Sequence, residues 1–228
     1  MDDVFERCLC DASVGLNNLT GVIKGGMTAM NKRILQCMFV WLFIVGPVYA
    51  QLPIPPPVVK PFADSRDWML VESVEYSIGY SGVIIIVPKG FVTDFASIPQ
   101  ALWSFGLSPY GRFSKAAIVH DYLYWKQDCT REQADNLLLI AMKESGVSRT
   151  QQSEIYLGVR AGGETAWESN RRARAAGLIK IIPGDRLDFP YEINWPDYRK
   201  QLFDLGITEP SPTETSAYCS FGNSTDVP

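Results

Sequence analysis

Two helix-start signals near the middle of the chain constrain its fold more than any other feature. The stretches "TREQ" (130–133) and "SRTQ" (148–151) both have the spacing of a capping box, in which a hydroxyl and an amide satisfy the first free backbone N–H groups of a helix. We predict a helix that begins at Arg131 and ends at Gly146, and a second helix that extends from the other signal to about Arg174.

A third helix and a small β region precede these two helices. A helix that begins between residues 109 and 114 and ends near Trp125 is joined to the next helix by a short loop, so the two must pack antiparallel. A short helix is expected over 97–103, and the Val/Ile-rich alternation of 68–95 predicts a β-hairpin or three-stranded meander. The fold class is therefore α+β, an N-terminal hairpin or meander followed by a three-helix core.

The composition changes divide the chain into five segments. Residues 62–200 form the predicted single globular domain, and the Pro-rich stretch 51–61 is an extended linker before it. Residues 201–228, rich in Pro, Ser and Thr near the end, are expected to be a flexible tail. Residues 30–50 have the layout of a signal peptide. The upstream extension 1–29 would place that signal inside the chain, so the simplest hypothesis is that translation starts at Met30 or Met27.

The signal predicts an exported protein. Lys32 and Arg33 precede an apolar run over 34–48, and "VYA" ends at Ala50 like a small-residue cleavage site. Cleavage there would release the chain to the periplasm or the medium; the alternative is a membrane anchor formed by 34–48. Loss of the signal would leave two cysteines, Cys129 and Cys219, which an oxidising compartment would allow to form one disulfide.

The net charge is −4, and the sequence contains no large Lys/Arg stripe. Nucleic acid is therefore not an expected partner.

The only histidine of the chain lies on an apolar helix face. The i, i+3, i+4 spacing places His120 and Tyr124 on the stripe that faces the next helix, where Asp135 occupies the corresponding stripe. A buried carboxylate needs a partner, and the candidates are His120 across the interface and Arg131 one turn back on its own helix. We favour His120, because this pair explains both burials and would orient the imidazole as a general base.

Three further polar residues are candidates for the site. Asp121, next to the histidine, and Asp94, where a strand gives way to a loop, could supply oxygen ligands for Ca²⁺ or Mg²⁺. The competing interpretations are a local hydrogen-bonded network with Tyr124 for Asp121 and an Asx-turn for Asp94. Arg160 lies on one face of the third helix and is expected to brace the core, with a substrate contact as the alternative.

The ordered motifs "FVTDFASIP", "AAIVHDYLY", "TREQADNLLLIAM" and "YLGVRAGGETAW" closely resemble a domain-of-unknown-function family, number 1353. The resemblance covers Phe91 to Trp167. That family occurs in bacteriophages, prophages and bacteria, and its name implies no activity.

The shorter unit "HDYLY…ADNLL" is similar to the core of secreted and parvoviral phospholipases A2. The resemblance implies that His120 activates water, Asp135 supports His120, Tyr124 is a hydrogen-bond partner and Asp121 is a calcium ligand. The sequence departs from that family at "SFGLSPYGRF" (104–113), which lacks the Gly-rich calcium loop. The cysteine framework of the secreted enzymes is also absent. These two differences bear most directly on the calcium assignment.

Two classes of function follow. The first is an exported, phage- or bacteria-encoded hydrolase of the cell envelope, in which a His–Asp dyad activates water and a phospholipid ester is the favoured substrate; a cell-wall amide is the variant. The second is a non-enzymatic phage envelope or virion module, in which the same pair only fixes the helix interface. Access of solvent to His120 separates the two classes.

Overall fold

The computed structural model describes residues 56–95, 111–209 and 216–228, all of which belong to one unit of the chain, Pro53–Pro228. The predicted signal or anchor at 30–50, the upstream extension and the short helix at 97–103 lie outside these residues. Within the described part of the chain, no helix has both the length and the apolar character needed to cross a membrane.

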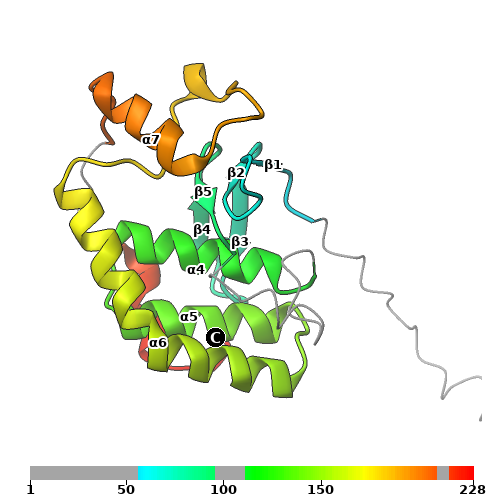
Figure 1. The fold of residues 1–228 in the computed structure, drawn as a ribbon. Helices are drawn as coiled ribbons and strands as arrows, with labels where there is room; N and C mark the ends of the chain where they lie inside the picture. Colours follow the sequence, from blue (N-terminus) through cyan, green and yellow to red (C-terminus); the bar gives the residue numbers. More distant parts are fainter. Residues whose placement is uncertain (1–55, 96–110, 210–215) are drawn as a thin grey trace, which may run out of the picture. The chain divides into compact units, whose positions relative to one another are not determined.

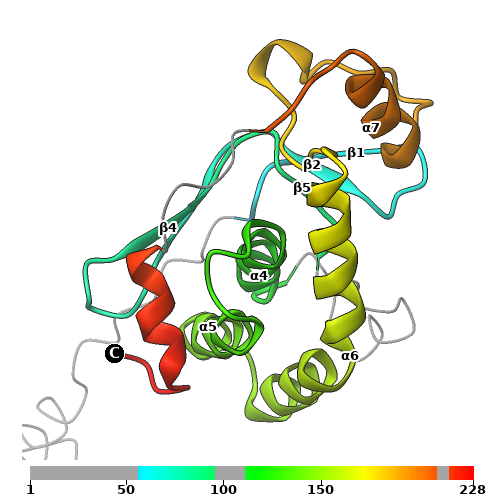
Figure 2. The ribbon, with the colours of Figure 1, turned by 90° about the vertical axis from the view of Figure 1, so that its left-hand side faces the viewer.

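Three helices form the centre of this unit: α4 (Ser114–Lys126), α5 (Arg131–Glu144) and α6 (Arg149–Ala175). Both start signals are confirmed, since the hydroxyls of Thr130 and Ser148 accept from the backbone N–H three residues on, and Thr130 and Gln133 complete the reciprocal capping box. Gly146 adopts φ +66°, the left-handed conformation that lets the chain leave α5. In Figures 1 and 2, α5 lies beside α4, and α6 packs along both.

The β region consists of two small antiparallel sheets. Strands β3 (Val74–Ser77) and β4 (Ile84–Val87) form the predicted hairpin, and β1 (Val59–Pro61) pairs with β2 (Trp68–Leu70), which pairs with β5 (Val92–Thr93). The α+β class is thus confirmed, but the third strand does not continue a meander. Gly90, at φ +85°, donates its N–H to the Leu70 carbonyl and turns the chain toward β2 instead of β4.

The predicted linker and tail differ from the structure at their inner ends. Val59–Pro61, which we assigned to the linker, is strand β1, because its backbone pairs with Trp68–Leu70. Helix α7 (Trp195–Asp204) continues past the expected domain end at residue 200, since its Leu202 is buried. It closes a second apolar cluster against β2 and β5, which contains Phe62, Met69, Val92, Ile179, Ile182, Phe189, Trp195, Tyr198 and Leu202.

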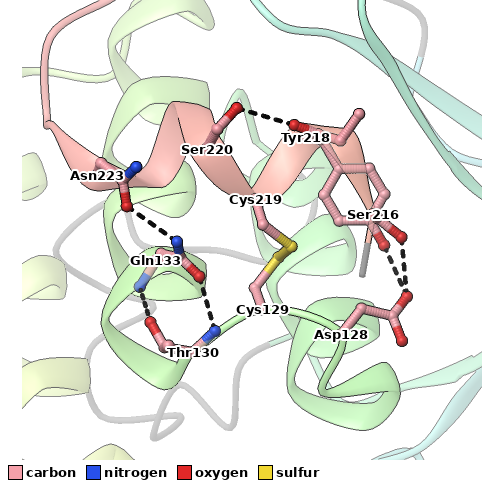
Figure 3. Close-up of a disulfide and its surroundings, with 10 residues drawn as sticks. Asp128, Cys129, Thr130, Gln133, Ser216, Tyr218, Cys219, Ser220 and Asn223 are labelled. Carbon is pink, nitrogen blue, oxygen red and sulfur yellow. Dashed lines mark hydrogen bonds between the residues drawn. A yellow bond between two sulfur atoms is a disulfide. The ribbon is translucent and has the colours of Figure 1, made fainter. Parts of the chain in front are cut away.

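The C-terminal residues 216–228, which we expected in the flexible tail, lie against α5. Their 3₁₀ helix η3 (Ala217–Asn223) is joined to the start of α5 by the predicted Cys129–Cys219 disulfide. Figure 3 shows the surrounding contacts: the hydroxyls of Ser216 and Tyr218 donate to Asp128, and Gln133 donates to Asn223. Cys219 and Gly222 are buried here, so this segment forms part of the folded unit.

Candidate active site

Helices α4 and α5 bring the predicted His–Asp pair together. His120 and Tyr124 lie one turn apart on α4, and both are buried at the interface with α5. The Nε2 atom of His120 lies 3.0 Å from Oδ1 of Asp135, which is completely buried on α5. The apolar periodicities of the two helices therefore located the interface correctly, and the short loop after Lys126 brings the two turns opposite each other.

Asp135 receives four side-chain donors instead of one. Its Oδ1 faces His120 and accepts from the Tyr124 hydroxyl at 2.6 Å, while its Oδ2 accepts from Arg131 at 3.2 Å and from Arg160 at 3.1 Å. The two candidate partners, His120 and Arg131, are thus both present, because a carboxylate has acceptor positions for both. Arg160, expected as a brace, reaches across from α6 to the same oxygen as Arg131.

These donors keep the carboxylate charged in a buried place. Burial alone would raise the pKa of Asp135, but hydrogen bonds from His120, Tyr124 and Arg160 hold that pKa below its usual value. Burial, and then the hydrogen bond to Asp135, raise the pKa of Tyr124, which therefore stays a neutral donor at ordinary pH. The site contains an ionised acceptor surrounded by groups that can only donate to it.

The other nitrogen of His120 has no such partner in the part of the chain that the structure describes. Among the described residues, nothing forms a hydrogen bond with Nδ1, although this atom is buried and the residue is only 3% exposed. Since an ionised carboxylate only accepts hydrogen bonds, Nε2 carries the proton that it shares with Asp135. The neutral imidazole then presents the lone pair of Nδ1, the atom of the site that can accept a proton.

Helix α6 determines where Tyr124 lies. A Cβ atom on Gly163 would be 2.3 Å from the Tyr124 hydroxyl oxygen, so only glycine leaves room for that hydroxyl. The Trp167 ring packs edge-on against the Tyr124 ring, with centroids 5.1 Å apart. Tyr124 is therefore fixed from the α6 side while it donates to Asp135 on α5.

Asp121 points toward the β region and away from the dyad. Its Oδ2 accepts from the buried Thr93 hydroxyl at 2.5 Å, and the same hydroxyl oxygen accepts from the N–H of Phe95 at 3.0 Å. Phe95 adopts φ +55°, a conformation that is costly for an aromatic residue. Asp121 thus bonds with Thr93 from β5, whereas the hydroxyl of Tyr124, the partner that we considered for Asp121, donates to Asp135.

The expected calcium ligands do not complete a metal site among the described residues. No group of three or more His, Cys, Asp or Glu side chains suited to a metal ion occurs in residues 56–95, 111–209 and 216–228. Asp94 lies next to Thr93, and its charge acts on Asp67. Calcium binding by Asp121 and Asp94 therefore stays a prediction.

Sequence reasoning missed Thr93 and Gly163, which position the site. Thr93 is a completely buried polar residue in a strand, and its partner Asp121 follows in a helix 28 residues later, a distance that no sequence period encodes. The "GG" pair of α6 does not by itself show which residue packs against it. Asn136, which donates to the Gly222 carbonyl and accepts from Tyr156, was also unassigned.

Comparison with known proteins gives a family match without an activity. Residues 68–159 match the family described as "Protein of unknown function (DUF1353)", which includes α4 and α5 and ends just before Arg160. "Uncharacterized protein y4jT" of Sinorhizobium fredii (strain NBRC 101917 / NGR234) is 32% identical over 78 residues, or 34% of this chain. The matched stretch is 23% of that relative, so the chain spans about a quarter of its length. No solved structure matches the chain significantly.

These matches support the family resemblance over the stretch that carries the His–Asp pair. They do not test the likeness to phospholipases A2 or the association with phages, and both stay predictions.

Proposed function

We propose that the protein is a hydrolase in which His120 acts as a general base on water, and that an ester of a membrane phospholipid is its substrate. One observation carries the proposal: His120 gives its Nε2 to a buried, charged Asp135 and leaves Nδ1 buried and without a hydrogen-bond partner among the described residues. An imidazole with one nitrogen fixed by a carboxylate and the other free has the arrangement of a general base.

The chemistry follows from that arrangement. His120 Nδ1 removes a proton from water, and the oxygen forms a bond to the ester carbonyl carbon. Asp135 stabilises the resulting imidazolium through Nε2–H. When the tetrahedral intermediate collapses, the ester C–O bond breaks and the proton on Nδ1 passes to the leaving alcohol. The products are a carboxylic acid and an alcohol, and the histidine returns to its neutral state.

Tyr124, Arg131 and Arg160 are positioning residues in this scheme. Each donates to Asp135 and none forms a hydrogen bond with Nδ1, so they fix the carboxylate that orients the base. The substrate class comes from the resemblance of "HDYLY…ADNLL" to phospholipases A2. Export of the chain, expected from residues 30–50, would bring it to the cell envelope where such lipids occur.

A second candidate is a non-enzymatic envelope module, favoured by the burial of the pair. His120 is 3% exposed, and Asp135 is saturated by four donors, as a purely structural brace would be. In that case His120 and Asp135 would only fix α4 against α5.

Hydrolysis of mixed phospholipid vesicles by the full chain distinguishes the two candidates. We expect fatty-acid release that His120→Ala abolishes and that Asp135→Asn reduces about 10²–10⁴-fold, the range of general-base contributions. Asn136→Asp is the matched control, because it changes the neighbouring α5 residue, whose side chain faces Gly222 and Tyr156 instead of the dyad. Circular dichroism must show that each variant is folded.

Parallel reactions with calcium and with a chelator test the calcium prediction. Release that needs calcium supports a cation near Asp121, and release that is insensitive to the chelator rejects it. If the folded protein releases nothing from vesicles but cleaves cell-wall fragments in a His120-dependent reaction, the proposed substrate class is wrong. The proposed catalytic role of the dyad then still holds. No turnover of either substrate contradicts the hydrolase proposal and favours the structural module.

A further inference from the structure

The free edge of the β3–β4 hairpin is an interaction surface that the site does not use. Along β4, Ile85 and Val87 are buried, whereas Ile84 and Ile86 are 48% and 53% exposed on the opposite face. We propose that β4 pairs antiparallel with β4 of a second copy of the chain, which joins two hairpins into one four-stranded sheet.

The backbone of β4 offers unpaired groups to such a partner. Ile78 donates its N–H to the Val83 carbonyl at 3.0 Å, which fixes the hydrogen-bonding phase of the hairpin. Because the phase alternates along antiparallel strands, Ile85 and Val87 bond to β3, and the N–H and C=O groups of Ile84 and Ile86 point away from it. No hydrogen bond from another described residue reaches these outward groups.

Hydrogen bonds anchor the hairpin at β3 and at its turn. Glu144, the last residue of α5, accepts from the Tyr76 hydroxyl and, at 2.6 Å, from the N–H of Gly79 near the hairpin turn. The C-terminal Pro228 carbonyl accepts from the N–H of Tyr80 at 3.3 Å. Figure 2 shows the hairpin beside α4 and η3, at the margin of the helical core. A partner strand would therefore meet an edge that is already ordered.

A second copy, related to the first by a two-fold axis through Ile85, can bond to the outward backbone groups of β4. In that register, Ile84 of one copy lies opposite Ile86 of the other, and both are residues whose backbone groups point outward. The two symmetric pairs form four backbone hydrogen bonds and place the exposed isoleucines side by side on one face. Such an interface is isologous and closes at two copies.

The chemistry of the strand favours an identical partner over other occupants. Residues 78–88 contain no Asp, Glu, Lys or Arg, so identical strands meet without repulsion, and the strand offers no charge to select a different peptide. A lipid surface would leave the outward backbone groups unsatisfied. Pro88, which has no N–H, ends the pairing on one side, and the exposed Glu75 on β3 discourages further strands.

Cysteine cross-linking tests the register directly. Opposed residues of a hydrogen-bonded antiparallel pair have Cα atoms about 5.5 Å apart, within the ~4.4–6.8 Å range of disulfides. We expect a mixture of the full-length Ile84→Cys and Ile86→Cys proteins to form the 84–86 cross-link under mild oxidation. Each protein alone should form no cross-link at its new cysteine, because the identical positions are offset by two residues. Mass spectrometry of linked peptides separates this product from linkages of the native cysteines.

Sedimentation velocity over a range of concentrations provides the second readout. The full chain should sediment faster as its concentration rises, and Ile86→Lys should abolish that change. Leu157→Lys is the matched control, since Leu157 is an exposed apolar residue on α6, and it should leave the dimer intact. A chain that stays monomeric, a dimer insensitive to Ile86→Lys, or cross-links in the single-variant samples alone would overturn the proposal.

Discussion

At the scale of the residue, four side-chain donors converge on one buried carboxylate. Asp135 collects His120, Tyr124, Arg131 and Arg160 from three helices, and loss of that charge would leave several buried donors without an acceptor. Removal of one partner of a buried ion pair typically costs about 3–5 kcal/mol. The lowered pKa of Asp135 implies that its contribution to stability is present above the unfolded pKa and is lost as the pH falls through the folded value.

For a second carboxyl group, that of Asp67, the contribution to stability depends on pH in the opposite direction. Burial, followed by the negative charges of Asp94 and Asp64, raises the pKa of Asp67 to about 6. Its favourable contribution is therefore complete below the unfolded pKa of 3.8 and is lost as the pH rises through about 6. We expect Asp67→Asn to raise the free energy of unfolding by about 1–2 kcal/mol at pH 8, after allowance for solvent screening, and by much less at pH 4. Urea denaturation at the two pH values measures the difference, and an equal effect at both would contradict this prediction.

At the scale of the element, the helices could be predicted from the sequence more completely than the contacts between elements. Capping residues and apolar periods are local signals, and they located α5, α6 and the His120–Asp135 interface. The pairing of β5 with β2, and the reach of Arg160 from α6 to Asp135, depend on turns and on a third element, so no single segment encodes them. The contact between Asp121 and Thr93 shows the same limit, because it joins a helix to β5.

Two adjacent glycines of α6 provide a matched test of how that helix supports the site. Gly163→Ala should displace the Tyr124 hydroxyl from Asp135 and lower stability by about 1–3 kcal/mol, the cost of a lost buried hydrogen bond. A Cβ on Gly162 has no neighbour within 4 Å, so Gly162→Ala should raise stability by up to about 1 kcal/mol through helix propensity. Thermal unfolding compares the two variants, and a shift of the same sign in both would refute the steric role of Gly163.

At the scale of the whole molecule, the C-terminal segment fastens the folded unit. The Cys129–Cys219 disulfide closes a loop across a sequence separation of 90 and fixes η3 on the helix that carries Asp135. Gly222 fits against the backbone of Gln133, where a Cβ would be 2.4 Å from the Gln133 carbonyl oxygen. Integrity of the site is thus linked to residues that lie far from it in the sequence.

Loss of this disulfide should destabilise the unit by about 4.6 kcal/mol, as chain entropy predicts for a loop of this length. Cys219→Ser should lower the free energy of unfolding by that order, and Cys129→Ser added to it should cost little more, because the bond is already absent. A reductant should destabilise the natural chain but not the double variant. Equal stability of the natural chain and the variants, measured by urea denaturation without reductant, would show that the bond does not form.

The most direct test of the central claim uses the fact that the chain has one histidine. In protein labelled with ¹⁵N-histidine, a long-range ¹H–¹⁵N correlation spectrum reports both imidazole nitrogens of His120 without overlap. We expect that, in the neutral imidazole, the proton lies on Nε2 toward Asp135 and Nδ1 is a bare base, and that Asp135→Asn disturbs this preference. A proton on Nδ1 with a bare Nε2 would contradict it, because the carboxylate would then not hold the imidazole in the orientation that a general base requires.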